Sequence, residues 1–452
     1  MAGLSHLSEI GKQGMLLSQF GIQITGKNIS NVNTRGYSRE RLDVNPVLPE
    51  ILSGFSMGSA INGDTLRRIR EDFVDRQFWS QTSLQSQYET EDSLLRQIEG
   101  VLPASNDSGL ATMLEDFWEA WNSLANDPES TVARTIVRDR AQTLALSFNR
   151  VNREFLAFQS TISDEINARV SEINDLAAQI AELNKINPGN NLDLEDQRDR
   201  LVDRLSELAN VDIRRDGNSV SVYISGLMIV SGKTAYEIDV EETETEEGIS
   251  QITAIIGGTD REISVTSGEM GALLSVHNYD IPDLLDRLDA LAIDLVQEVN
   301  TLHRSGYNLD GTTGLDFFAA TTEGAGSIAV NGSIVANVEL IATSDAPGES
   351  GNGNVAKAVA DLADAEVIGN QTIGEYYRSL VSTLGNRIQE TDFLMTNQTK
   401  IVDHLDMQRQ SISGVSMEEE MTRMVQLEQA FTAASRLVAT ADELTRTLLQ
   451  MI

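Results

Sequence analysis

The sequence predicts a mainly α-helical protein with an inserted β-rich region, an α+β fold whose two ends form a coiled coil. Apolar residues recur at alternating spacings of three and four at both ends of the chain, which is typical of a coiled-coil seam. Long helical stretches, divided by proline and glycine, make up most of the rest. A central segment alternates β-branched and polar residues, as strands do.

The N-terminal axial helix is expected within residues 1–40, in a coiled coil with the C-terminus. Its seam runs through Leu7, Ile10, Gly14, Leu17, Gly21 and Ile24. Glycine weakens a helix, but on a seam it lets a neighbouring helix approach closely. The run from Asn31 to Gly36 ends the helix, and residues 41–66, which contain two prolines, are expected to be extended or looped.

Residues 41–210 are expected to form the N-terminal half of a long-helix body. The helical pattern that begins near Ile69 is interrupted three times, at Pro103, Asp127–Pro128 and Asn187–Gly189. Within this pattern, one apolar stripe has the spacing of a helix face: Ile166, Val170, Ile173, Ala177 and Ile180.

The middle of the chain is expected to hold a β-rich outer domain at residues 211–268, with turns at Asp216–Gly217 and Gly257–Gly258. Seven acids and no base lie between Glu237 and Glu247, which predicts an exposed loop. Residues 269–303 are predicted to return as a helix to the body. Residues 304–370 are loop-rich and mixed, and belong to an outer or intermediate domain.

The C-terminal half of the helical body is expected at residues 371–412, and the C-terminal axial helix at 413–452. This last helix opens at Ser416, with Glu419 three residues on, as in a capping box. Its seam runs through Met417, Met424, Leu427, Phe431, Ala434, Val438, Ala441, Thr445, Leu448 and Ile452.

Composition excludes several classes of protein. The 452 residues suffice for two or three domains, and the absence of cysteine excludes disulfides and thiolate catalysis. A net charge of −35 argues against binding to nucleic acid or to anionic membranes. No apolar run approaches the roughly 18 residues of a membrane span, so we expect no membrane insertion. The N-terminus lacks the pattern of a cleaved signal peptide, so export would need another route.

Motifs that suggest catalysis do not have the surroundings that catalysis needs. Gly54–Gly58 matches a nucleophile elbow around Ser56, but its flanks are loop-like rather than strand and helix. Gly21–Lys27 and Gly226–Thr234 approach a phosphate-binding loop. The first lies in a helical pattern, and the second contains a strand-like interior and one residue too many.

Metal and cofactor sites are not indicated either. Gly306–Gly311 faintly resembles a calcium loop, but Phe317 stands where the bidentate glutamate belongs. The four histidines show no metal-ligand spacing: His6, His277, His303 and His404. The sequence therefore predicts no catalytic, cofactor-binding or metal-binding residues, no cofactor, and a protein that is not an enzyme.

Four separated segments of the sequence carry a resemblance to known proteins. The first, KNISNVNTRGYSRERL, matches the signature of flagellar axial proteins at Asn28, Ile29, Asn31, Asn33, Thr34, Gly36 and Tyr37. Arg35 stands where that signature usually has proline. The others are residues 192–226, Val299–Phe318 and 413–452. Taken in this order, the four segments resemble the FlgK family of flagellar hook-associated proteins.

The resemblance implies a structural subunit at the junction of hook and filament, exported unfolded by the flagellar type III system. It implies self-assembly into a ring or short tube through paired terminal helices. It also implies contacts with hook protein and hook-associated protein 3, and an export chaperone on the C-terminal helix. The expected assembly residues are Leu7, Ile10, Leu17, Ile24, Asn28, Asn31, Asn33, Gly36, Tyr37, Met424, Leu427, Phe431, Val438 and Leu448.

Three alternatives remain open from the sequence. The nearest is another flagellar axial subunit, such as a rod or hook protein. A serine hydrolase built on Ser56 is the alternative from a different class. The third is a free-standing coiled-coil adhesin or scaffold that self-associates through its ends.

We predict that both terminal segments are disordered in the isolated subunit. Burial of a seam's large side chains contributes about 9–18 kcal/mol, which with helix hydrogen bonds does not exceed the entropy of ordering the segment. Amide exchange of the dilute monomer should therefore be fast within residues 1–40 and 413–452. Strong protection there would contradict the prediction.

Overall fold

The computed structural model describes residues 2–46, 61–102, 109–187, 191–217, 219–244 and 250–450. The chain divides into two compact units, each assembled from separate stretches of the sequence. Unit 1 comprises residues 1–84, 173–237 and 398–452, and unit 2 comprises residues 85–172 and 238–397. Both ends of the chain lie in unit 1.

Helices dominate both units, which confirms the predicted fold class. Their bounds are α1 Ala2–Ser30, α2 Asp72–Val101, α3 Leu110–Asn126, α4 Thr131–Ile186, α5 Leu192–Leu208, α6 Gly268–Ser275, α7 Ile281–Ser305, α8 Gly332–Ala336, α9 Asn354–Asp361, α10 Ile373–Ser413 and α11 Met417–Gln450. A π-helical turn joins α6 to α7. Two of the three predicted breaks are confirmed, because α3 ends just before Asp127 and α4 ends just before Asn187, while Pro103 lies outside the described residues. Over the described residues, no helix has the length and apolar character to cross a bilayer.

Strands form three antiparallel sheets. In unit 1, β1 (Glu40–Pro46) pairs with β2 (Ile61–Arg68), and a second sheet has the order β3-β4-β5-β6. The strands of that second sheet are β3 Val211–Asp216, β4 Ser219–Ile224, β5 Leu227–Ser231 and β6 Thr234–Ala235. In unit 2, β7 (Ile238–Glu244), β8 (Ser250–Ile256) and β9 (Glu262–Ile263) form a sheet with β8 in the centre.

The acidic segment was predicted to be a loop, and this is wrong for its described part. Residues 238–244 are strand β7, paired along their whole length with β8. Ile238 is buried and Val240 half-buried, while Asp239 and Glu241 are exposed. Because alternate side chains of a strand point to opposite faces, two apolar residues suffice to bury one face of it.

The core of unit 1 joins helix α4 to strand β4. The buried Asn184 side chain donates to the Val220 carbonyl (2.8 Å) and accepts from the Val220 amide (3.0 Å). Alternate residues of β4 are buried, ending at Ile224. The buried amide thereby satisfies the backbone of Val220, which lies before the point at Val222 where β4 begins to pair with β5.

The loop-rich segment of unit 2 folds against an aromatic cluster and a buried arginine. Phe317 lies 5.0 Å from Trp121 between ring centroids, and 6.2 Å from Phe117. Arg134 is fully buried and donates to the Pro128 and Ile341 carbonyls and to the Thr343 hydroxyl. Burial lowers the pKa of Arg134 to about 10. These contacts give residues 304–370 an ordered structure without long helices.

His303 holds the same region together through two hydrogen bonds, and its imidazole is neutral. Its Nδ1 donates to the Leu315 carbonyl (2.7 Å), and its Nε2 accepts from the Ala342 amide (2.9 Å). Burial lowers the pKa of His303 from its ordinary 6.5 to about 4. A proton on Nε2 would break the bond from Ala342, so the fold requires the neutral imidazole.

We predict that protonation of His303 lowers the stability of unit 2 as the pH falls. Burial raises the pKa of Asp280, in the same unit, to about 6, which acts in the opposite direction, so the effect of His303 is the difference between the unsubstituted chain and a variant at this position. The unfolded histidine takes up a proton near pH 6.5 but the folded one only near pH 4. The stabilisation is thus complete above pH 6.5, and about 2–3 kcal/mol is lost between pH 7 and 4.5. Urea unfolding followed by tryptophan fluorescence should show that the unsubstituted chain loses this much more stability over the pH range than His303→Gln does. The exposed His404→Gln serves as control, and an equal slope in both variants would contradict the assignment.

Candidate functional site

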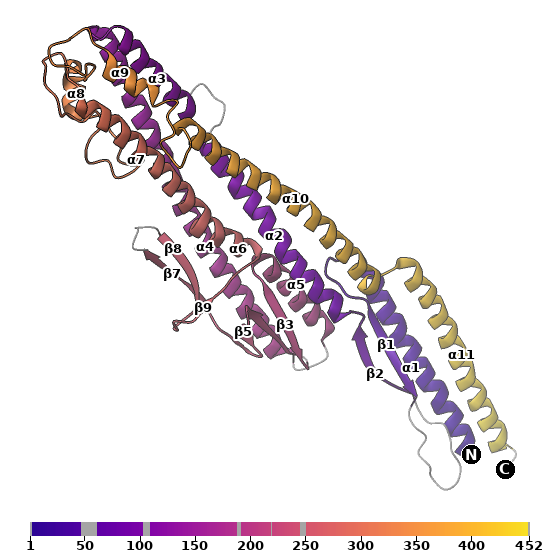
Figure 1. The fold of residues 1–452 in the computed structure, drawn as a ribbon. Coiled ribbons are helices and arrows are strands. Elements are labelled where there is room, and N and C mark those ends of the chain that lie inside the picture. The colour runs from indigo at the N-terminus through magenta and orange to yellow at the C-terminus, as the bar shows by residue number, and fades with distance from the viewer. Residues whose placement is uncertain are drawn as a thin grey trace. The chain divides into compact units, whose positions relative to one another are not determined.

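Helices α1 and α11 lie side by side and antiparallel, so both ends of the chain meet (Figure 1). A Cβ placed on Gly14 would lie 3.3 Å from the Ala434 Cβ, and one on Gly21 would lie 2.9 Å from Leu427 Cδ2. At Gly11 it would lie 2.6 Å from Val438 Cγ2. The predicted close approach at the seam glycines is therefore present within a single chain.

The predicted seam residues differ in how far this pairing covers them. Ile24 is buried, whereas Ile10 and Leu448 each keep 43% exposure. The other predicted seam residues of the site are half-buried: Leu7, Leu17, Met424, Leu427, Phe431 and Val438. One partner helix thus covers only part of the apolar surface.

Apart from Met417, which belongs to the predicted seam of α11, the following exposed apolar side chains lie outside the predicted seams. Leu16 (66%) and Phe20 (44%) stand one turn apart on α1. On α11, Met417, Met421 and Val425 recur every four residues and are 41–57% exposed. Leu444 and Leu449 are exposed as well. Sequence analysis identified only one apolar seam on each helix. It missed these second stripes, although the spacing of four residues between their members can be read from the sequence.

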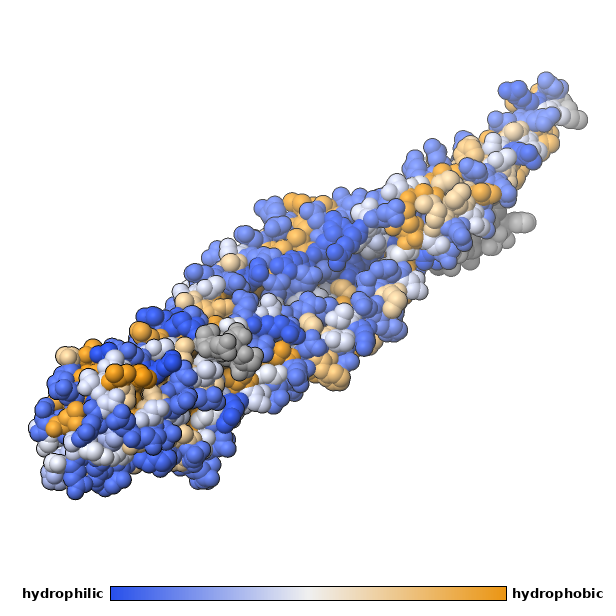
Figure 2. All heavy atoms as spheres, turned by 90° about the horizontal axis from the view of Figure 1, so that it is seen from above, coloured by the Kyte–Doolittle hydropathy of each residue, from blue (hydrophilic) through white to orange (hydrophobic). Residues whose placement is uncertain are grey.

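One face of the molecule is mostly hydrophilic (Figure 2). Figure 2 shows hydrophobic atoms as separate patches on a largely blue face. Soluble proteins seldom leave the face of a helix apolar without a partner. The α1–α11 pair shares such exposed apolar side chains with other helices, among them Val132 and Ile136 of α4.

The asparagine-rich motif folds into a polar clamp at the base of the pair. Buried Asn28 donates to the Glu40 carbonyl (3.0 Å) and to Glu420 Oε2 (3.1 Å). Its carbonyl oxygen accepts from the Tyr37 hydroxyl (2.8 Å) and the Glu40 amide (3.0 Å). Lys27 pairs with Glu40 at 2.5 Å and with Asp193 of α5 at 2.8 Å. Asn28 uses every hydrogen-bonding group that an amide offers.

The remaining motif residues shape the turn after α1. Asn31 donates to the Lys27 carbonyl, while Asn33 is exposed. Gly36 has φ +77°, and a Cβ there would lie 2.7 Å from Arg200 Cγ, so glycine is required on both grounds. Burial, together with the negative charge of Glu40, raises the pKa of Tyr37 far above its usual value. The hydroxyl therefore stays protonated and keeps donating to Asn28.

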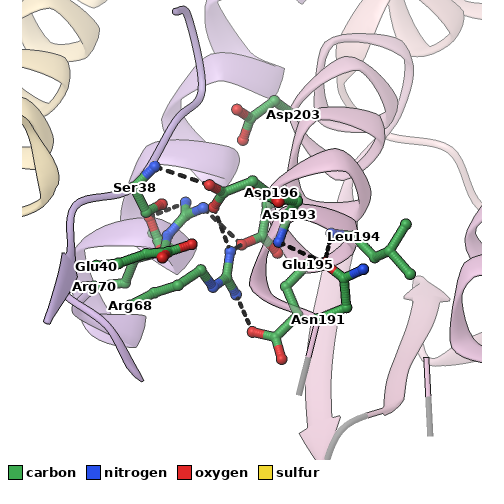
Figure 3. A network of polar contacts seen from close by, with 12 residues as sticks. Ser38, Glu40, Arg68, Arg70, Asn191, Asp193, Leu194, Glu195, Asp196 and Asp203 are labelled. Carbon is green, nitrogen blue, oxygen red and sulfur yellow. Dashed lines mark hydrogen bonds and ion pairs between the residues drawn. The ribbon is translucent and has the colours of Figure 1, made fainter. Parts of the chain in front are cut away.

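A buried ion network fastens the β1–β2 hairpin to α5 (Figure 3). Arg68 pairs with Asp196 and Asp199, both at 2.7 Å, and with Glu195 at 2.8 Å. Arg70 bridges Asp199 (2.6 Å) and Asp75 of α2 (2.8 Å). Burial alone would raise the pKa of Asp199, but Arg70 and Arg68 hold it well below its usual range. The carboxylate stays ionised, and the hairpin that follows α1 is held rigidly.

The acidic N-terminal part of α5 also contacts the segment that follows α1. Asn191 caps the helix, accepting from the amides of Asp193 and Leu194. Asp196 accepts from the Ser38 amide at 3.0 Å, directly after the motif (Figure 3). The acids were visible in the sequence, but their partners Arg68 and Arg70 lie more than a hundred residues away, and no local pattern connects them.

The motifs that resembled catalytic sites are structural where they are described. Lys27 of the first loop-like motif lies in α1 and holds Glu40. Gly226–Thr234 contains strand β5, and Asp310–Gly311 is a turn. Within the described ranges, no cluster of three potential metal ligands is present. Gly54–Gly58 lies outside the described residues.

Comparison with known proteins identifies the family. The chain is 30% identical to flagellar hook-associated protein 1 of Bacillus subtilis (strain 168), over 96% of this chain and 96% of the relative. The chain belongs to the flagellar hook-associated protein 1 (FlgK) family. It is a structural subunit of the bacterial flagellum, at the junction of hook and filament, and not an enzyme.

Other comparisons agree with the FlgK assignment. The FlgK helical domain family matches residues 95–318, and the C-terminal family of flagellar basal body rod FlgEFG proteins matches residues 408–451. Flagellar hook-associated protein 1 of Escherichia coli (strain K12) is 22% identical over 97% of this chain and 98% of the relative. The flagellar hook junction protein FlgK from Burkholderia pseudomallei has the same fold, with TM-score 0.66 and 16% identity over 75% of this chain and 100% of that one.

Tight packing between α1 and α11 predicts opposite effects for two alanine substitutions. Gly26→Ala adds a methyl where no atom lies within 4 Å, so the gain in helix propensity, about 1 kcal/mol, should stabilise the pair. Gly11→Ala gains the same propensity but meets the β-branched Val438 at 2.6 Å, and should stabilise less or not at all. Thermal loss of helix circular dichroism measures both. Equal stabilisation would mean that the helices are not this close.

Proposed function

We propose that the paired terminal helices are the assembly element through which copies of this chain join in the hook–filament junction. The observation that carries the proposal is the second apolar stripe on each helix, Leu16 with Phe20 and Met417 with Met421 and Val425. Burying one large apolar side chain contributes about 1.5–3 kcal/mol, so a neighbouring copy that covers these stripes would stabilise both.

The predicted site residues divide into two roles in this proposal. Half-buried seam residues such as Phe431 and Val438 hold the pair together, and exposed ones such as Ile10 and Leu448 extend its outer surface. Asn28 and Tyr37 contribute through hydrogen bonds inside the chain. These bonds set the angle at which the chain leaves α1. Repeated contact between identical copies forms a closed ring or a short tube.

The specific neighbours follow from the family rather than from any contact in this chain. Hook protein would lie on one side and hook-associated protein 3 on the other. A dedicated chaperone would cover α11 before export through the flagellar type III system, because the exposed methionines and leucines of α11 need shielding from premature association.

Two double variants test the assembly proposal. Phe431→Asp with Val438→Asp charges the seam, and should abolish assembly while unit 2 stays folded. Leu16→Asp with Phe20→Asp charges only the exposed stripe, and should block assembly while α1 still pairs with α11. Swimming, filament number by electron microscopy, and flagellin lost to the medium are the readouts.

The matched control is Gln19→Asp with Gln23→Asp, which adds the same charge at the same spacing on exposed positions of α1. It should swim normally. Normal filaments from the Leu16 and Phe20 variant would refute the outer contact, and normal filaments from the Phe431 and Val438 variant would refute the role of the pair.

A further inference from the structure

Asn28 and Glu420 occupy facing positions on the seams of α1 and α11. Seven residues separate Gly14 from Gly21, and a further seven lead to Asn28. On α11, Ala434 and Leu427 face these glycines, and seven residues before Leu427 comes Glu420. Both side chains are almost fully buried, Asn28 at 1% and Glu420 at 2% exposure.

Apart from these two residues, the seam gives little preference for one alignment of the two helices over another. It consists largely of apolar and small residues, and a slide of one heptad sets apolar residues against apolar ones again. Gly14 would then face Leu427, which its missing Cβ accommodates as Gly21 does now. The Thr445 hydroxyl donates to Ala441 of its own helix, so it places no demand on register.

The Asn28–Glu420 pair, in contrast, favours a single alignment of the two helices. A slide in one direction sets the Glu420 carboxylate against Gly21, and a slide in the other sets the Asn28 amide against Leu427. Either slide buries a group that has lost its partner, which is more costly than leaving an apolar layer imperfect. In the observed register, Glu420 also lies in the first turn of α11, where the helix dipole favours a carboxylate.

We infer that the Asn28–Glu420 hydrogen bond is a register lock that selects one alignment of the two terminal helices. Glu420 is the positioning residue that sequence analysis did not identify. The lock acts within one chain, so it selects the register whenever α1 and α11 pair, including the transient pairing expected of an isolated subunit whose terminal segments are largely disordered. By fixing the alignment, it fixes which apolar residues of the two helices form each outer surface.

Engineered cysteine pairs measure the register directly, because the full chain has no cysteine of its own. Leu17→Cys with Phe431→Cys reports the observed register, since these positions lie midway between the facing glycine layers. Leu17→Cys with Met424→Cys reports a slide of one heptad. Brief oxidation of the purified chain, followed by the mobility of the intramolecular disulfide on a gel, also captures transient pairing.

The in-register disulfide should form at least about tenfold more than the slid one. Glu420→Leu should bring the two yields within about threefold, and Glu420→Gln, whose side-chain oxygen can still accept from Asn28, should restore the preference. The exposed Glu428→Leu is the control and should change nothing. Similar yields without substitution at 420, an unchanged ratio in Glu420→Leu, or no disulfide of either kind would overturn the lock. Swimming of the same variants tests assembly separately.

Discussion

The rest of the structure depends on the close antiparallel approach of α1 to α11. Glycines at positions 11, 14 and 21 bring the two backbones near each other, and the buried Asn28–Glu420 pair ends the contact at its base. A pair of helices has too little interior to cover all the apolar residues it carries. Pairing therefore leaves the outer apolar stripes exposed to solvent. It holds them in position for a contact with a second surface.

The polar base of the pair gives this arrangement its rigidity. Asn28, Tyr37 and Glu40 close the turn after α1, and Arg68 and Arg70 fasten the following hairpin to acids of α5. Breaking one partner of a buried ion pair costs about 3–5 kcal/mol, so the ends of unit 1 cannot swing freely while the network is intact.

Much of the fold could be predicted from the sequence, because its signals are local. Proline and glycine marked the helix ends, and three-four spacing marked both seams, with Gly14 and Gly21 correctly assigned to close approach. The ion network could not be predicted, because Arg68 and Asp196 meet only through the tertiary fold. Strand β7 was missed because its acids suggested solvent, although Ile238 and Val240 carried the strand pattern. The fit of Glu420 to Asn28 became visible only when the register was known.

Oxidation of Met421 tests the central claim most directly. This methionine is 57% exposed on the outer stripe of α11, so dilute peroxide should convert it to the sulfoxide rapidly in the purified subunit. If neighbouring copies complete the burial begun by the α1–α11 pair, peptide mass spectrometry of intact flagella should show Met421 oxidised at least about tenfold more slowly. Equal rates in the free subunit and in the flagellum would contradict the account.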